Sequence, residues 1–141
     1  MSYDRTLRWS AFGFGIFFAL VVALGYIPSL NQGMDHVSMQ APGEHQMMGL
    51  YMIGAADDVT HGLTALVFLL AALLSASLSR LALLAFGWYY AIDASIYLIT
   101  GVVQHKPVLS NILLNLPHVV LSAIMLSLAY HRPRVAGAPV L

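Results

Sequence analysis

Long apolar stretches alternate with short polar segments along this chain of 141 residues. Mainly apolar residues fill about residues 9–30, 57–79, 81–103 and 111–130. Because a helix needs about 20 apolar residues to cross a hydrocarbon core roughly 30 Å thick, each stretch is predicted to be a transmembrane helix. The pattern therefore predicts an all-α membrane protein, a single four-span membrane domain over residues 1–141 with an outer loop over residues 31–56.

The composition excludes several other classes of protein. Hydrophobic residues make up 60% of the chain and charged residues 9%, which leaves too little polar surface for a soluble domain. Six Lys and Arg balance six Asp and Glu, so no basic field favours nucleic acid as a partner. The chain has no cysteine, which excludes disulfides and thiolate metal sites.

The basic residues predict the orientation of the spans, because cytoplasmic loops of membrane proteins accumulate Lys and Arg. Five arginines fall on one side of a four-span chain and a single lysine on the other. The arginines are Arg5, Arg8, Arg80, Arg132 and Arg134, and the lysine is Lys106. This distribution predicts a protein of bacterial inner-membrane type, with both termini and a turn at Ser79 and Arg80 in the cytoplasm and the 31–56 loop outside.

The second and fourth spans open with a repeated element. An acid or amide, two spacers and a histidine precede an apolar helix at Asp58 and His61, and again at Asn115 and His118. Upstream, an Ala-Phe-Gly triplet at residues 11–13 matches a second one at residues 85–87. This internal repeat predicts a four-transmembrane-helix bundle built from two repeated helical hairpins.

The repeated element resembles the helix starts of a bacterial family of small four-helix membrane proteins of unknown function, whose spans open with Asn-x-x-His. The resemblance rests on Asp58 and His61 in one span and on Asn115 and His118 in the other. Asp58 stands where the family pattern has an amide, and Pro117 interrupts the second element. The resemblance implies a four-helix fold and no particular activity.

Polar residues recur at helical spacing inside the spans and define a candidate site in the outer half of the bundle. Its members are Asp58, His61, Asp93, Asn115 and His118. Asp93 lies near the middle of its span, where an unpaired carboxylate is costly, so a partner is expected among His61, His118 and the tyrosines of the same span.

The aromatic residues of the first and third spans are assigned to two faces by their spacing. Tyr89 and Tyr97 share a helix face with Asp93 and are expected inside the bundle. A second group is expected to face lipid, or a larger partner, and consists of Phe14, Phe17, Phe18, Trp88 and Tyr90.

Several chemical interpretations of the polar residues stay open at this stage. A structural network needs no ligand, because polar side chains hydrogen-bond between helices in membrane bundles. Two imidazoles and two carboxylates also suit zinc or iron. Haem b held between His61 and His118 is a third interpretation, and proton or ion translocation along the acidic and histidine side chains is a fourth.

The outer loop contains a cluster of thioether and imidazole side chains. They are Met34, His36, Met39, His45, Met47 and Met48. Thioether and imidazole ligands suit copper, particularly the monovalent ion. The alternative is an amphipathic loop whose methionines lie on lipid or on the mouth of the bundle.

No catalytic motif is present in the sequence, such as a nucleophile elbow, a phosphate-binding glycine loop or a zinc-protease helix. The sequence therefore predicts a non-catalytic accessory or structural subunit without a cofactor. The expected partners are the lipid bilayer and other membrane subunits, or further copies of the chain. The alternative is a metal-binding or haem-binding protein for redox chemistry or transport.

Overall fold

The computed structural model describes residues 2–27, 45–47 and 51–131. Within these ranges the chain forms four helices and two short strands. They are α1 (Tyr3–Gly25), β1 (His45–Met47), β2 (Tyr51–Ile53), α2 (Ala55–Leu74), α3 (Ala76–Val103) and α4 (Val108–Tyr130). The strands pair antiparallel with His45 opposite Ile53, a small sheet that the sequence pattern did not predict.

All four helices are long and apolar enough to cross a membrane. This confirms the prediction of an all-α membrane fold, and the protein is an integral membrane protein. The helices begin two to six residues earlier than the apolar stretches, as α1 does at Tyr3. Helical structure extends beyond the apolar stretch because Arg5 has a high helix propensity and Asp4 is favourable in the first turn of a helix, where its charge interacts with the helix dipole.

A single residue, Ser75, connects α2 to α3. Its backbone is extended, with φ −163° and ψ 160°, and its hydroxyl accepts a hydrogen bond from the backbone N–H of Leu78 at 3.1 Å. Serine is favoured at such a position because its side chain satisfies one of the unpaired donors of a helix start. The turn predicted at Ser79 and Arg80 is therefore wrong, because both residues lie inside α3.

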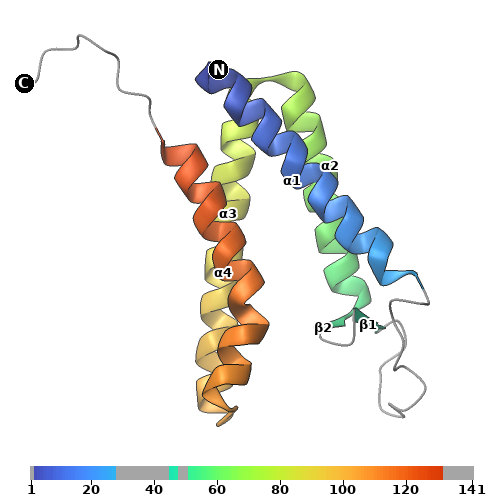
Figure 1. Ribbon diagram of the computed structural model, residues 1–141, viewed down its shortest axis with the longest axis vertical. Coiled ribbons are helices and arrows are strands. Elements are labelled where there is room, and N and C mark those ends of the chain that lie inside the picture. Colours follow the sequence, from blue (N-terminus) through green and yellow to red (C-terminus); the bar gives the residue numbers. More distant parts are fainter. Residues whose placement is uncertain (1, 28–44, 48–50, 132–141) are drawn as a thin grey trace, which may run out of the picture.

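The four helices form two hairpins, α1 with α2 and α3 with α4 (Figure 1). The start of α1, the α2–α3 turn and the end of α4 lie at one end of the molecule (Figure 1). We call this the terminal end, and the end that carries the strands and the α3–α4 turn the loop end. The hairpins lie close together at the terminal end, where the Tyr3 hydroxyl of α1 donates to the Leu128 carbonyl of α4 at 3.3 Å. They splay apart toward the loop end (Figure 1).

Equivalent contacts recur in the two hairpins. Arg8 Nε of α1 donates to the Ala72 carbonyl of α2 at 2.8 Å, and Arg80 Nε of α3 donates to the Ala129 carbonyl of α4 at 2.8 Å. Each arginine thus satisfies a carbonyl at the end of its neighbouring helix, where no backbone donor remains. The hairpins are therefore repeats of one another, with Arg8 equivalent to Arg80 and Ala72 equivalent to Ala129.

Close helix packing recurs in the same register. A Cβ added to Gly15 would lie 2.7 Å from Leu69 Cγ, and one added to Gly87 would lie 2.8 Å from Leu126 Cδ2. The sequence separation of these glycines equals that of Arg8 and Arg80. The structure therefore pairs Phe14 and Gly15 with residues 86 and 87, and the match predicted between residues 11–13 and 85–87 is out of register by two.

Candidate functional site

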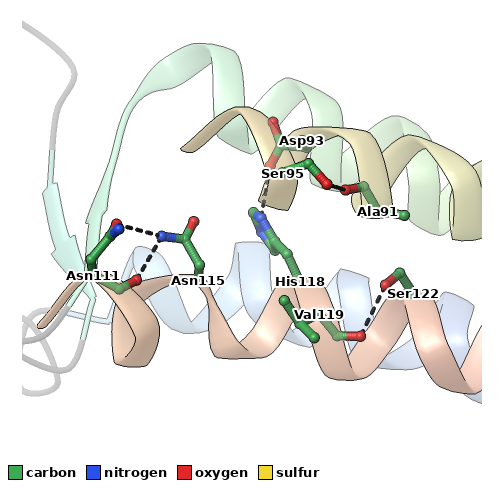
Figure 2. A network of polar contacts seen from close by, with 8 residues as sticks. All are labelled: Ala91, Asp93, Ser95, Asn111, Asn115, His118, Val119 and Ser122. Atoms are coloured by element: carbon green, nitrogen blue, oxygen red, sulfur yellow. Dashed lines mark hydrogen bonds and ion pairs between the residues drawn. The ribbon is translucent and has the colours of Figure 1, made fainter. Parts of the chain in front are cut away.

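Asp93 and His118 form a direct polar contact between α3 and α4. His118 Nδ1 lies 2.7 Å from Asp93 Oδ2, and the side chains are 31% and 25% exposed, respectively. Figure 2 shows them pointing toward one another from facing helices. The expectation that Asp93 has a partner is confirmed, and the partner is His118. The pair fixes α3 against α4 and gives the carboxylate a donor at a depth where it would otherwise be costly.

The amides of α4 form a second contact, closer to the loop end than the first. The Asn115 Nδ2 group donates to the Asn111 carbonyl at 2.7 Å, one turn earlier in the same helix (Figure 2). Asn111 Nδ2 in turn donates to the Leu98 carbonyl of α3 at 3.0 Å. Gly101 leaves room for this amide, because a Cβ at that position would overlap Asn111. Asn115 was predicted as a site residue, whereas Asn111, its i−4 neighbour, was missed.

Asp58 contacts the end of α1. The Tyr26 hydroxyl donates to Asp58 Oδ2 at 2.8 Å, which links the two helices of the first hairpin at the loop end. This hydrogen bond to the carboxylate, together with its negative charge, raises the pKa of the Tyr26 hydroxyl above its usual value of 10.0. The neighbouring Asp57 carboxylate accepts from the backbone N–H of Gly54 at 2.9 Å and so caps the start of α2.

The substitution Tyr26→Phe is expected to lower the thermal stability of the protein at neutral pH, because Asp58 loses a donor. A tyrosine whose pKa is raised on folding stabilises the fold below its unfolded pKa, and this contribution is lost as the pH rises through the folded pKa. The difference in unfolding midpoint between wild type and variant should therefore have its largest value below pH 10.0 and decrease above it. Unfolding midpoints at neutral and at strongly alkaline pH measure it, and a pH-independent difference would contradict the assignment.

Two aromatic rings, Phe18 and Tyr90, connect His61 to His118, and we call these four residues the ring stack. The His61 ring lies 5.7 Å from that of Phe18, with 21° between the planes. Phe18 lies 5.3 Å from Tyr90 and almost parallel to it, at 6°. Tyr90 lies 5.1 Å from His118. The two histidines are thus linked through rings of α1 and α3, and the middle contact joins one hairpin to the other.

Two polar atoms of the ring stack are buried and make no well-formed hydrogen bond within the described residues, namely His61 Nδ1 and the Tyr90 hydroxyl. The backbone of Asp57, one turn earlier in α2, neighbours the His61 ring. The Thr64 hydroxyl neighbours that of Tyr90, but it donates its own hydrogen to the Thr60 carbonyl at 2.7 Å. A buried polar atom without a partner is costly, so both positions are of interest as sites for a donor or acceptor from outside the chain.

The repeat explains why His61 and His118 differ. The residue of the first hairpin that is equivalent to Asp93 is Val21, counted with the separation of Arg8 and Arg80. His118 therefore has a carboxylate partner at Nδ1, whereas the residue of the first hairpin that is equivalent to Asp93 is apolar. The repeat supplies an imidazole in both hairpins but a carboxylate in only one.

The sequence pattern misplaced several aromatic residues. Phe18 and Tyr90 were expected on the lipid face but are 1% and 2% exposed, whereas Tyr89 and Tyr97 were expected inside but are 47% and 55% exposed. The missed signal is the segment Phe-Gly-Ile-Phe-Phe-Ala-Leu at residues 14–20, which matches Phe-Gly-Trp-Tyr-Tyr-Ala-Ile at residues 86–92. Its fifth position is the buried ring in both hairpins.

The predicted site residues form separate contacts and are not joined into one network. Asp58 contacts α1, Asn115 contacts its own helix, Asp93 and His118 form a pair, and His61 joins this pair through rings alone. In the described part of the chain, no group of three His, Asp or Glu side chains is placed to hold a metal ion.

The predicted copper loop lies outside the described residues. Met34, His36, Met39 and Met48 are not among them, and His45 and Met47 are placed in β1 by their backbone alone. The structure therefore does not test the copper prediction. Arg132 and Arg134, which contributed to the predicted orientation, also lie outside the described residues.

Comparison with protein-family models, curated proteins and solved structures finds no match to this chain. The class is thus defined by the fold itself: an integral membrane protein of four apolar helices arranged as two repeated hairpins. Its candidate site is the ring stack together with the Asp93 and His118 pair.

Proposed function

We propose that the protein is a non-catalytic accessory or structural subunit of a membrane assembly. The observation that carries the proposal is that polar side chains in the loop-end half are used to join the two helices of each hairpin. Tyr26 and Asp58 do so in the first hairpin, and Asp93 and His118 in the second. Contacts of this kind fix helix register in membrane bundles and need no ligand.

The outer surface of the helices supports the same proposal. Large apolar side chains are exposed along every helix, including Trp9, Leu66, Ile92 and Ile112. In a bilayer such a surface contacts lipid or other transmembrane helices. Outside the helices, the described residues comprise only short turns, end residues and the two strands, so they provide little surface for a water-soluble substrate.

The proposed orientation places the terminal end in the cytoplasm of a bacterial inner-membrane type of membrane. Arg5, Arg8 and Arg80 all lie near the terminal end, and Lys106 lies in the α3–α4 turn at the opposite end. The excess of arginine over lysine between the two ends supports this orientation by the positive-inside rule. A cysteine at exposed Ser110, labelled from outside intact cells by an impermeant thiol reagent, tests it.

The combined substitution of His61 and His118 by Gln tests the structural role. Removing the charge-assisted bond to Asp93 is expected to cost about 2 kcal/mol of stability. Metal content and the visible absorption spectrum of the detergent-purified protein should stay unchanged. His131→Gln is the matched control, because His131 is exposed and lies beyond the end of α4. Loss of a stoichiometric metal or chromophore in the double variant would overturn the proposal.

A second candidate function is metal or haem binding for redox chemistry or transport. The buried and unpartnered Nδ1 of His61 favours it, as does the contact of His118 with Asp93, because metal-ligating histidines usually donate their other N–H to a carboxylate. A Soret band would identify haem. A stoichiometric metal that survives washing with chelator, and is lost on substitution of His61, would identify a metal site.

A further inference from the structure

A cavity of about 590 Å³, open to the surface, lies at the terminal end, between the start of α1 and the end of α2. Its volume falls within the roughly 300 to 1,000 Å³ that is typical of small-molecule sites. Arg5, Arg8 and Asp4 line its polar part, and Trp9, Phe12 and Leu73 line its apolar part. The cavity therefore combines charge with a broad apolar wall.

The cavity lies at the depth of the lipid headgroups. Helix α1 has 23 residues, and at about 1.5 Å of rise per residue it exceeds a hydrocarbon core about 30 Å thick. Its first turn, which carries Arg5, therefore extends into the headgroup layer. Arg8 is level with the end of α2, because its guanidinium donates to the carbonyls of Ala72 and Leu73 at 2.8 and 3.1 Å. Trp9 is 60% exposed, as expected for a side chain at the membrane interface.

The charge in the cavity favours an anion. Arg8 is held in place by the carbonyls at the end of α2, so its positive charge forms a fixed part of the wall. Arg5 is exposed, and its guanidinium has no hydrogen bond or ion pair with the described residues. Two arginines face one carboxylate, Asp4, which leaves a net positive charge. A guanidinium matches the geometry of a phosphate group through paired N–H donors.

We propose that this cavity binds the headgroup of one anionic phospholipid. Arg5 binds the phosphate, Arg8 adds positive charge from the wall, and Trp9, Phe12 and Leu73 cover the glycerol and the first part of an acyl chain. The chain is expected to hold one such site and not two, because the second hairpin lacks the residues that form it. The equivalents of Arg5 and Trp9 in the second hairpin are Ser77 and Leu81, which supply neither the charge nor the aromatic side chain.

The test is lipid binding by the full-length protein in detergent, measured by native mass spectrometry. Phosphatidylglycerol and phosphatidylcholine with identical acyl chains are the probes. Wild type is expected to retain one phosphatidylglycerol in preference to phosphatidylcholine. Arg5→Gln should weaken phosphatidylglycerol binding about fivefold, which corresponds to about 1 kcal/mol for one arginine near a lipid headgroup. Asp4→Asn should strengthen it, because the variant removes the opposing carboxylate.

Lys106→Gln is the matched control, because it removes one positive charge from an exposed position at the loop end. Equal weakening by Arg5→Gln and Lys106→Gln would overturn the proposal, as would equal retention of the two lipids by wild type. Glycerol phosphate separates a lipid site from a site for soluble phosphate. Displacement of the lipid by millimolar glycerol phosphate would also overturn the assignment, since the apolar wall would then contribute nothing.

Discussion

Gly15→Leu and Gly87→Leu are each expected to lower the unfolding midpoint strongly, whereas Gly13→Leu should not. A Cβ at Gly15 would lie 3.1 Å from the backbone nitrogen of Leu69, and a Cβ at Gly87 would lie 3.2 Å from Met125 Cβ. Backbone and Cβ atoms cannot rotate away, so the helices of each hairpin must separate. Overpacking of this kind costs about 1 to 3 kcal/mol. Thermal unfolding in detergent, followed by the loss of helical signal, measures the effect.

Gly13 is the matched control, because it lies in the same helix as Gly15 and an added Cβ there meets no atom within 4 Å. Leucine at this position should leave the midpoint unchanged or raise it slightly, since glycine is a poor helix former. Because the hairpins are repeats of one another, Gly15→Leu and Gly87→Leu should also lower the unfolding midpoint by similar amounts. An equal lowering of the unfolding midpoint by leucine at all three glycines would contradict close helix packing at Gly15 and Gly87.

The fold was largely predictable from the sequence because a membrane imposes a length requirement on each helix. Four apolar stretches of sufficient length gave four helices, and the repeated Asp58, His61, Asn115 and His118 element gave the correct register between α2 and α4. The α2–α3 turn was not predictable from hydropathy, because apolar residues continue on both sides of Ser75. What ends α2 there is an extended backbone and a serine cap, which are local features.

The register between α1 and α3 was mispredicted because two matches compete. The Ala-Phe-Gly triplets at residues 11–13 and 85–87 are identical and align Gly13 with Gly87. Gly87 packs closely against α4, however, whereas a Cβ added to Gly13 would meet no atom within 4 Å. The longer match that begins at Phe14 and Phe86 places a glycine against the neighbouring helix in both hairpins. Close packing therefore distinguishes the two registers, and a search for identical residues alone does not.

The candidate site was predictable only in part. The cost of a carboxylate near the middle of a membrane correctly predicted a partner for Asp93. The partner of Asp58 was missed because Tyr26 matches the pattern of an interfacial anchor, and only the fold brings the end of α1 beside the start of α2. The buried rings of Phe18 and Tyr90 were missed because, in a membrane, an aromatic side chain is equally compatible with lipid and with the protein interior.

The two hairpins share a scaffold and differ in polar content. The arginine caps and the close glycine contacts occur in both, and these features hold the helices of each hairpin together. Asp93 occurs only in the second hairpin, and its equivalent in the first is Val21. As a result the two histidines at the ends of the ring stack differ. His118 is paired with a carboxylate, whereas His61 Nδ1 makes no such contact.

A double-mutant cycle at Asp93 and His118 should show strong coupling between the two residues. His118→Leu leaves the Asp93 carboxylate without its partner near the middle of the membrane, and the expected loss is on the order of 2 to 3 kcal/mol. Asp93→Leu with His118→Leu removes both polar groups and should restore most of this stability, because replacing both members of a buried polar pair by apolar residues is often nearly neutral. Unfolding in a mixed-detergent titration measures all four proteins. If the losses of stability caused by Asp93→Leu and by His118→Leu added up in the double variant, the two side chains would not interact directly.

The first hairpin provides the reverse of this experiment. Val21→Asp places a carboxylate at the position equivalent to Asp93 and should give the unpartnered His61 Nδ1 an acceptor. An aspartate at this depth is costly by itself, so the informative comparison is between two backgrounds. Val21→Asp should destabilise the His61→Leu variant by about 2 kcal/mol more than it destabilises wild type, the size expected for a charge-assisted hydrogen bond. Equal destabilisation by Val21→Asp in wild type and in His61→Leu would show that residue 21 does not contact His61 as Asp93 contacts His118.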